Sequence, residues 1–164
     1  MRKLIAVLAG LIILLAVNFT IYQREKLLAD GRVVLLELAP VDPRSLMQGD
    51  YMALRFKVAT DSFPGWNVER KSVDGRLVVA LDERGVASFK RLADNTPLAA
   101  NEAVLQYRIR SNQIKFATNA FFFEEGSGQK YQTARYGEFR VSADGEMLLN
   151  NLRGADLAVL GSTP

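Results

Sequence analysis

An uncharged apolar segment near the N-terminus constrains this chain more than any other feature of its sequence. It runs from Leu4 to Val17 as LIAVLAGLIILLAV, and no charged residue follows until Arg24. A hydrocarbon core of about 30 Å needs about 20 helical residues, so a helix from Leu4 to Tyr22 is long enough to span a membrane. A buried core helix would not need apolar residues on every face. We therefore expect residues 1–23 to form a transmembrane helix.

A cleaved signal peptide is the competing interpretation of this segment. Cleavage needs small residues at the site, and the apolar run passes into Ala16-Val17-Asn18, whose last member fits that pattern poorly. We therefore expect an uncleaved signal anchor. Residues 24–32 form a short connector, in which the helix continues until Asp30-Gly31 stops it.

Positive charges beside the span indicate its orientation. Arg2 and Lys3 precede it, together with the free amino group, and Arg24 and Lys26 follow it, so the bias is slight. A short N-terminal tail needs no machinery to stay inside, and the absence of cysteine is compatible with an oxidising compartment. These observations favour an extracytoplasmic position for the rest of the chain.

Composition excludes several classes of function. The 164 residues include no Cys and no His, which excludes a disulfide scaffold, a Cys/His zinc site and a Ser-His-Asp triad. No cofactor and no metal are predicted, since Glu124, Glu125 and Glu138 match no calcium loop. Residues 1–30 hold four Lys+Arg and two Asp+Glu, and the remainder holds 17 and 16. Without a basic stripe in the remainder, nucleic acid is not an expected partner.

Alternating hydrophobicity dominates the chain after the connector. In residues 51–58 every even-numbered residue is apolar, which is typical of a half-buried antiparallel strand. Turn signals at Asp74-Gly75, Asp82 to Gly85 and Asp144-Gly145 separate such runs. Eight or nine short strands predict an all-β domain over residues 33–164, an antiparallel barrel or sandwich. The candidate strands are 33–38, 51–59, 77–82, 86–91, 103–110, 114–123, 137–142, 145–150 and 157–160.

Two segments depart from this pattern. Ser127 to Tyr136, SGQKYQTARY, combines a possible N-cap with polar helix formers before Gly137, and predicts one short helix of about two turns. Asp61 to Ser72 contains Pro64-Gly65 and the single Trp66, and predicts a loop.

The segment Val41 to Lys57, VDPRSLMQGDYMALRFK, has its own turn chemistry. Gly49 can supply a positive φ, and Asp50 can accept hydrogen bonds from the backbone of the turn. Leu54 and Phe56 then enter the core side of the strand. The other face presents Tyr51, Arg55 and Lys57, so this segment is a structural turn, a recognition surface or both.

The order Gly49-Asp50-Tyr51, Leu54 and Phe56 resembles the motif of a small bacterial family named GDYXXLXY, with Phe56 in place of its last tyrosine. The resemblance extends to residues 121–126, FFFEEG, and to residues 131–141, YQTARYGEFRV, which include Tyr136. Proteins of this family are membrane-anchored and are associated with polytopic membrane proteins. The resemblance therefore implies a single-pass protein of the bacterial inner membrane with a periplasmic domain and an integral membrane partner.

Three consecutive aromatic residues complete the candidate surface. Phe121, Phe122 and Phe123 cannot all point one way on a strand, so at least one must leave the main core. That ring either packs under the helix predicted at 127–136 or belongs to an exposed patch for a partner or lipid. The surface candidates are thus Arg55, Lys57, Trp66, Phe121, Phe122, Phe123 and Tyr136, beside the motif residues.

A Ser/Lys signal peptidase is the enzyme class that a His-free, membrane-anchored β domain resembles. Residues 43–50 resemble the P-x-x-L-x-x-G-D surroundings of its nucleophile, but the alignment places Val41 and Asp42 at the Ser-Met positions. Ser45 is the nearby hydroxyl, and spacing selects none of the candidate bases Lys57, Lys90 and Lys115. We therefore expect no catalytic residue.

The leading interpretation of the whole chain is a non-enzymatic accessory or binding protein. The alternatives are a Ser/Lys hydrolase and a small-ligand-binding barrel whose mouth would be lined by Trp66 and Tyr51.

Overall fold

A long helix and a β domain make up the chain. The computed structural model describes residues 2–39, 47–48, 51–62, 73–110 and 113–161. Helix α1 (Arg2–Asp30) is long and apolar enough to cross a membrane. Its large apolar side chains from Leu4 to Tyr22 are exposed, as contact with lipid requires. The helix ends at Asp30, where the sequence predicts its end, and Gly31 N–H donates to the carbonyl of Leu27 at 2.9 Å.

The rest of the described chain is mostly β, which confirms the predicted class. One antiparallel sheet has the order β1-β9-β10, the second β2-β3-β8 and the third β5-β4-β6-β7. The strands are β1 (Arg32–Glu37), β2 (Met47–Gln48), β3 (Tyr51–Ala53), β4 (Val73–Leu81), β5 (Ala87–Leu92), β6 (Glu102–Arg110), β7 (Gln113–Lys115), β8 (Ala120–Phe122), β9 (Tyr136–Val141) and β10 (Met147–Arg153).

One hydrophobic core is shared by the three sheets. Isolated bridges join their segments, a parallel one from Leu35 to Val86 and an antiparallel one from Leu38 to Phe56. Phe56 is 2% exposed, and its ring makes edge contacts with the rings of Phe116 and Phe139 at centroid distances of 6.0 and 5.4 Å. Phe56, which follows β3, therefore packs against β9 of the first sheet and against the segment that follows β7 of the third.

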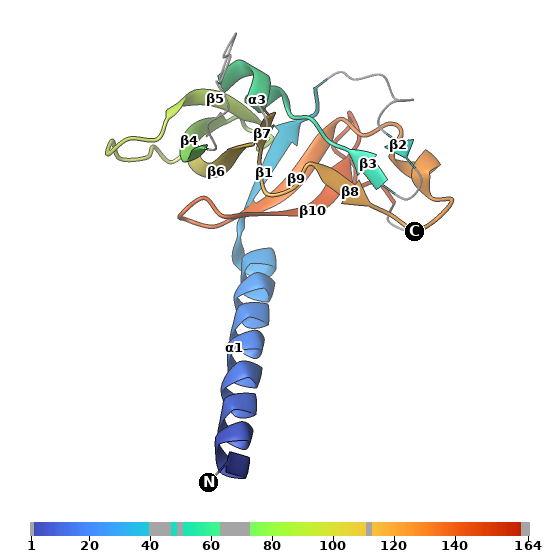
Figure 1. Ribbon diagram of the computed structural model, residues 1–164. Helices are drawn as coiled ribbons and strands as arrows, with labels where there is room; N and C mark the ends of the chain where they lie inside the picture. Colours follow the sequence, from blue (N-terminus) through green and yellow to red (C-terminus); the bar gives the residue numbers. More distant parts are fainter. Residues whose placement is uncertain (1, 40–46, 49–50, 63–72, 111–112, 162–164) are drawn as a thin grey trace.

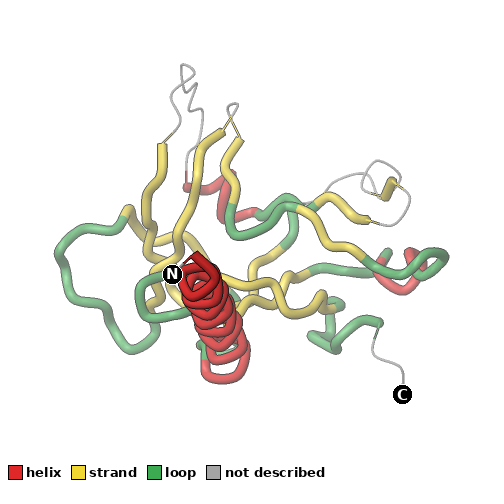
Figure 2. Tube along the Cα trace, turned by 60° about the horizontal axis from the view of Figure 1, so that its bottom comes forward, coloured by secondary structure: helices red, strands yellow, loops and turns green. Residues whose placement is uncertain are grey.

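Helix α1 meets the domain at β9 and β10 (Figure 1). Leu27 is buried there, and Arg24 forms an ion pair with Glu146 on the turn before β10. Arg140 of β9 donates to the carbonyl of Gly31 at 3.2 Å. The β2-β3-β8 sheet and the β5-β4-β6-β7 sheet extend to opposite sides of the helix axis (Figure 1 and Figure 2). The domain thus overhangs the end of the helix on both sides.

Two predicted strands are wrong in part. The strand predicted at 51–59 ends at Ala53, and helix α3 (Lys57–Ser62) follows it. Val58 is the buried residue of α3. A single buried residue does not distinguish a helix from a strand, so the alternating pattern could not show where the strand ends. The strand predicted at 114–123 is split into β7 and β8. Thr118 causes the break, because its hydroxyl donates to the carbonyl of Ala120 and accepts from the N–H of the same residue.

Three other local predictions need correction. Asp74-Gly75 is no turn but part of β4, where Gly75 lies opposite Tyr107 of β6. A β-carbon at Gly75 would lie 2.6 Å from the Tyr107 ring, so the glycine makes room for that ring. The helix predicted at 127–136 is the 3-10 helix η1 (Gly128–Tyr131), and Tyr136 is already the first residue of β9. At 157–160, where a last strand was predicted, the structure has an isolated antiparallel bridge between Val159 and Arg153 in place of a strand.

Candidate functional site

Tyr51 and Phe122 form a cross-strand aromatic pair at the start of β3. They lie directly opposite in the antiparallel register, and their ring centroids are 5.8 Å apart. Met52 and Phe121, the next register pair, turn to the other face and join the core. Alternation along β3 and β8 therefore puts one aromatic pair on the outside. We call Tyr51 and Phe122 the aromatic pair.

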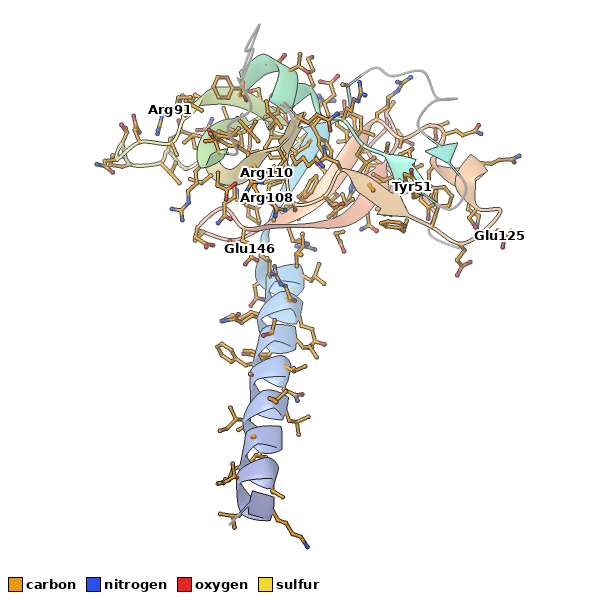
Figure 3. The ribbon with its side chains drawn as sticks, in the orientation of Figure 1. Tyr51, Arg91, Arg108, Arg110, Glu125 and Glu146 are labelled. Carbon is orange, nitrogen blue, oxygen red and sulfur yellow. The ribbon has the colours of Figure 1, made fainter. Side chains whose placement is uncertain are left out.

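Phe122 is exposed to an unusual degree. Its side chain is 74% exposed, against 47% for Leu92, the next most exposed large apolar side chain described outside α1. Tyr51 is half-buried beside it, and Figure 3 places Tyr51 on the β3 side of the domain, away from the axis of α1. A large aromatic ring in water is the kind of group that an interface buries.

The other two phenylalanines of the run pack on η1. Phe121 meets the Tyr131 ring edge-on at 5.0 Å, and Phe123 stacks on the same ring at 5.4 Å. Packing against the 127–136 segment is therefore confirmed for Phe121 and Phe123, and contact of an exposed ring with a partner or lipid stays a prediction. Phe121 and Phe123 hold η1 against the domain, and Phe122 is exposed.

The remaining motif residues divide between core and surface. Leu54 and Phe56 are both 2% exposed, as the alternation predicts. Arg55 and Lys57 are exposed, but β3 ends before them, and Lys57 pairs with Glu37 at 3.2 Å. Tyr51 therefore has Phe122 as its ring neighbour, and the predicted row of Tyr51, Arg55 and Lys57 along one strand is wrong.

Several predicted positions fall elsewhere. Gly49, Asp50, Ser45 and Trp66 lie outside the described residues. Tyr136 is half-buried in β9, opposite Glu37 of β1 and Arg153 of β10. It takes no part in the aromatic pair.

The comparison with protein families decides where this chain belongs. The model of the GDYXXLXY protein family matches residues 13–152, from the middle of α1 to the end of β10. The chain belongs to the GDYXXLXY family. No curated protein and no solved structure matches it.

A buried carboxylate of this GDYXXLXY protein was not predicted from its sequence. Glu138 of β9 is 2% exposed and accepts hydrogen bonds from Asn150, at 3.0 Å, and from Arg153. Burial alone would raise the pKa of Glu138, but these hydrogen bonds and the charge of Arg153 lower it overall. Arg153 also donates to the carbonyl of Leu157 at 2.6 Å, in a turn where Leu157 has a φ of 64°. Glu138 thus anchors the C-terminal turn of the domain.

A second buried carboxylate interacts with two positively charged side chains. Glu102 of β6 is 5% exposed, forms an ion pair with Lys90, and lies 3.5 Å from Arg91. The hydrogen bond from Lys90, followed by one from the N–H of Ala99, lowers the pKa of Glu102. Lys90, one of the candidate bases, is thereby held as the partner of a buried acid.

Proposed function

We propose that this GDYXXLXY protein is a single-pass accessory protein of the bacterial inner membrane that binds an integral membrane partner. In this proposal α1 is an uncleaved signal anchor, and the β domain is periplasmic. The aromatic pair of Tyr51 and Phe122 is the contact with the partner. The single observation that carries the proposal is the exposed Phe122 ring beside the tyrosine of the family motif.

The position of the aromatic pair suits a partner in the same membrane. Arg24, which pairs with Glu146 of the domain, lies two residues after the end of the expected span at Tyr22. If the span ends at Tyr22, a rise of about 1.5 Å per helical residue would put the domain directly above the membrane surface. The β2-β3-β8 sheet overhangs one side of α1 (Figure 1), so a neighbouring membrane protein would lie beneath it.

A non-enzymatic role is part of the proposal. Ser/Lys catalysis requires a neutral lysine next to the nucleophile. Lys57 is paired with Glu37, and Lys90 with the buried Glu102, so the side-chain nitrogen of each has a carboxylate and not a hydroxyl as its partner. If Ser45 has no hydrolytic role, Ser45→Ala leaves any cellular phenotype of the protein intact. Loss of function in a folded, membrane-bound Ser45→Ala protein would favour the hydrolase.

Co-purification tests the partner directly. The full-length protein is extracted from native membranes in mild detergent, and the proteins that accompany it are identified by mass spectrometry. We expect one integral membrane protein in a constant ratio to the bait. Tyr51→Ala and Phe122→Ala should each lower its recovery about tenfold, as truncation of an aromatic hot spot does.

Leu92→Ala is the matched control for that experiment. Among the described residues outside α1, Leu92 is the next most exposed large apolar side chain, and it lies on β5, in the sheet on the other side of α1 (Figure 1). Its replacement should leave recovery of the partner unchanged. Equal losses in all three variants would mean that the aromatic pair is not the contact.

A further inference from the structure

A cavity of about 780 Å³ lies where α1 meets the domain. Its walls come from the end of α1, from β4 and β6, from residues 116–118 and from the start of β10. Phe116 and Met147, both buried, form part of an apolar side. Arg24, Arg76 and Arg108 supply positive charge to the same cavity. The cavity thus combines an apolar wall with a cluster of guanidinium groups.

The two acidic groups of the cavity already have partners. Asp74 pairs with Arg110 at 2.7 Å, and Glu146 pairs with Arg24. By contrast, no hydrogen bond or ion pair within the described chain engages the side chains of Arg76 and Arg108. Arg76 also acts on Asp144 through its charge, which contributes least to the lowered pKa of Asp144, whereas the hydrogen bond from Ser142 contributes most. Two cations are therefore available to an anionic ligand.

The cavity lies at the depth of lipid headgroups. Arg24 lines it and lies two residues, about 3 Å along the helix, beyond the expected end of the span. Headgroup layers occupy about 5–7 Å on each side of the hydrocarbon core. In Figure 3, Arg108 lies between Arg110 and Glu146, on the side of the four-stranded sheet nearest α1. Arg108 therefore lines the same cavity as Arg24, the residue next to the expected end of the span.

We propose that this cavity binds the phosphate of an anionic phospholipid, with Arg76 and Arg108 as the phosphate ligands. Arginine presents a planar fork of donors that matches phosphate geometry. Leu148 and Leu149, which also line the cavity and are partly exposed, would contact the apolar part of the lipid next to the headgroup. The inference rests on the anchoring of α1 in the proposed function, but not on the aromatic pair or on a protein partner.

Native mass spectrometry of the full-length protein in an uncharged detergent tests this site. The probes are short-chain phosphatidylglycerol and phosphatidylcholine of the same chain length. We expect tighter binding of phosphatidylglycerol. Arg76→Gln and Arg108→Gln should each weaken it about tenfold or more, as loss of a hydrogen bond to a charged group does. Arg55→Gln, which removes one exposed charge outside the cavity, is the control and should bind as the unaltered protein does.

Three results would overturn the proposal. The first is equal binding of the two lipids, and the second is an equal loss in Arg55→Gln. The third is displacement of phosphatidylglycerol by inorganic phosphate at concentrations similar to its own, which would identify a site for free phosphate instead. If only the lipid site is wrong, the protein is still found in the membrane fraction. If the proposed anchoring is wrong, the protein is absent from that fraction, so the two outcomes can be distinguished.

Discussion

Gly137 of β9 and Phe56 of the family motif pack so closely that a β-carbon at position 137 would lie 3.0 Å from Cε1 of Phe56. The same β-carbon would lie 3.2 Å from the ring of Phe139 and 3.4 Å from Leu149. Gly137 has strands on both sides, opposite Leu36 of β1 and Leu152 of β10. The last aromatic residue of the motif is thus seated against a glycine of the central strand of another sheet.

Gly137→Val should destabilise the domain through this contact. Overpacking of a tight core forces side chains out of their rotamers and costs about 1–3 kcal/mol. Chemical denaturation of the full-length protein in detergent micelles measures the free energy of unfolding. Ala143→Val, on the exposed turn before β10, adds two methyl groups without this contact and is the control. Equal stability of the two variants would contradict the packing described for Phe56.

Leu54→Ala and Phe122→Ala should separate the core of the motif region from its surface. Leu54 is 2% exposed, so its truncation should lower the free energy of unfolding by about 2–5 kcal/mol. Phe122 is 74% exposed, and its truncation should change stability by less than about 1 kcal/mol. Melting curves of both variants make the comparison. Similar losses of stability would show that Phe122 is a structural residue of the domain.

Acid should unfold the domain in part through Glu138. Its pKa is lowered in the folded protein, so it contributes stability at pH values above the unfolded value of 4.5. That contribution is lost as the pH falls below 4.5 and through the folded value. Glu138→Gln should lower stability at neutral pH and flatten the loss in acid. The measurement is denaturation from neutral pH to about pH 3, with the exposed Glu125→Gln as control. A profile unchanged by Glu138→Gln would refute this role.

Local hydrophobic patterns predicted the helix and most strands, because their periods survive in the folded chain. The alternation predicted the burial of Leu54 and Phe56 correctly, even though the strand ends before them. Val58 of α3 is buried in the same core, so the apolar pattern continues where the strand does not. Strand partners that are far apart in the sequence could not be predicted in this way. Tyr51 and Phe122 are 71 positions apart in the sequence, and their contact depends on the pairing of β3 with β8.

The buried Glu138 shows a second limit of sequence patterns. The register of β10 shifts between Leu149 and Asn151, at a β-bulge. Of the two partners of Glu138, Asn150 lies within this shift and Arg153 follows it. A bulge changes which side chains face each other, and strict alternation contains no sign of it. The sequence pattern of β9 therefore did not indicate which of its charged residues would be buried.

The orientation of α1 can be tested with fusions after Pro164. We expect a reporter that is active only outside the cytoplasm to work at this position, and one active only in the cytoplasm to fail. Mass spectrometry of membrane-extracted protein should find residues 1–22 still attached. A working cytoplasmic reporter would place the β domain inside the cell, and a missing N-terminal segment would show cleavage of the anchor.

Site-specific photo-crosslinking from position 122 tests the central claim most directly. A photoreactive phenylalanine in place of Phe122 keeps an aromatic ring next to Tyr51, and the same residue in place of Leu92 probes an exposed position in the opposite sheet. After irradiation of intact membranes, we expect position 122 to yield one discrete adduct with an integral membrane protein, and position 92 to yield none. The adduct should weaken in a Tyr51→Ala background. Crosslinking of the same protein from position 92 but not from position 122 would contradict the account.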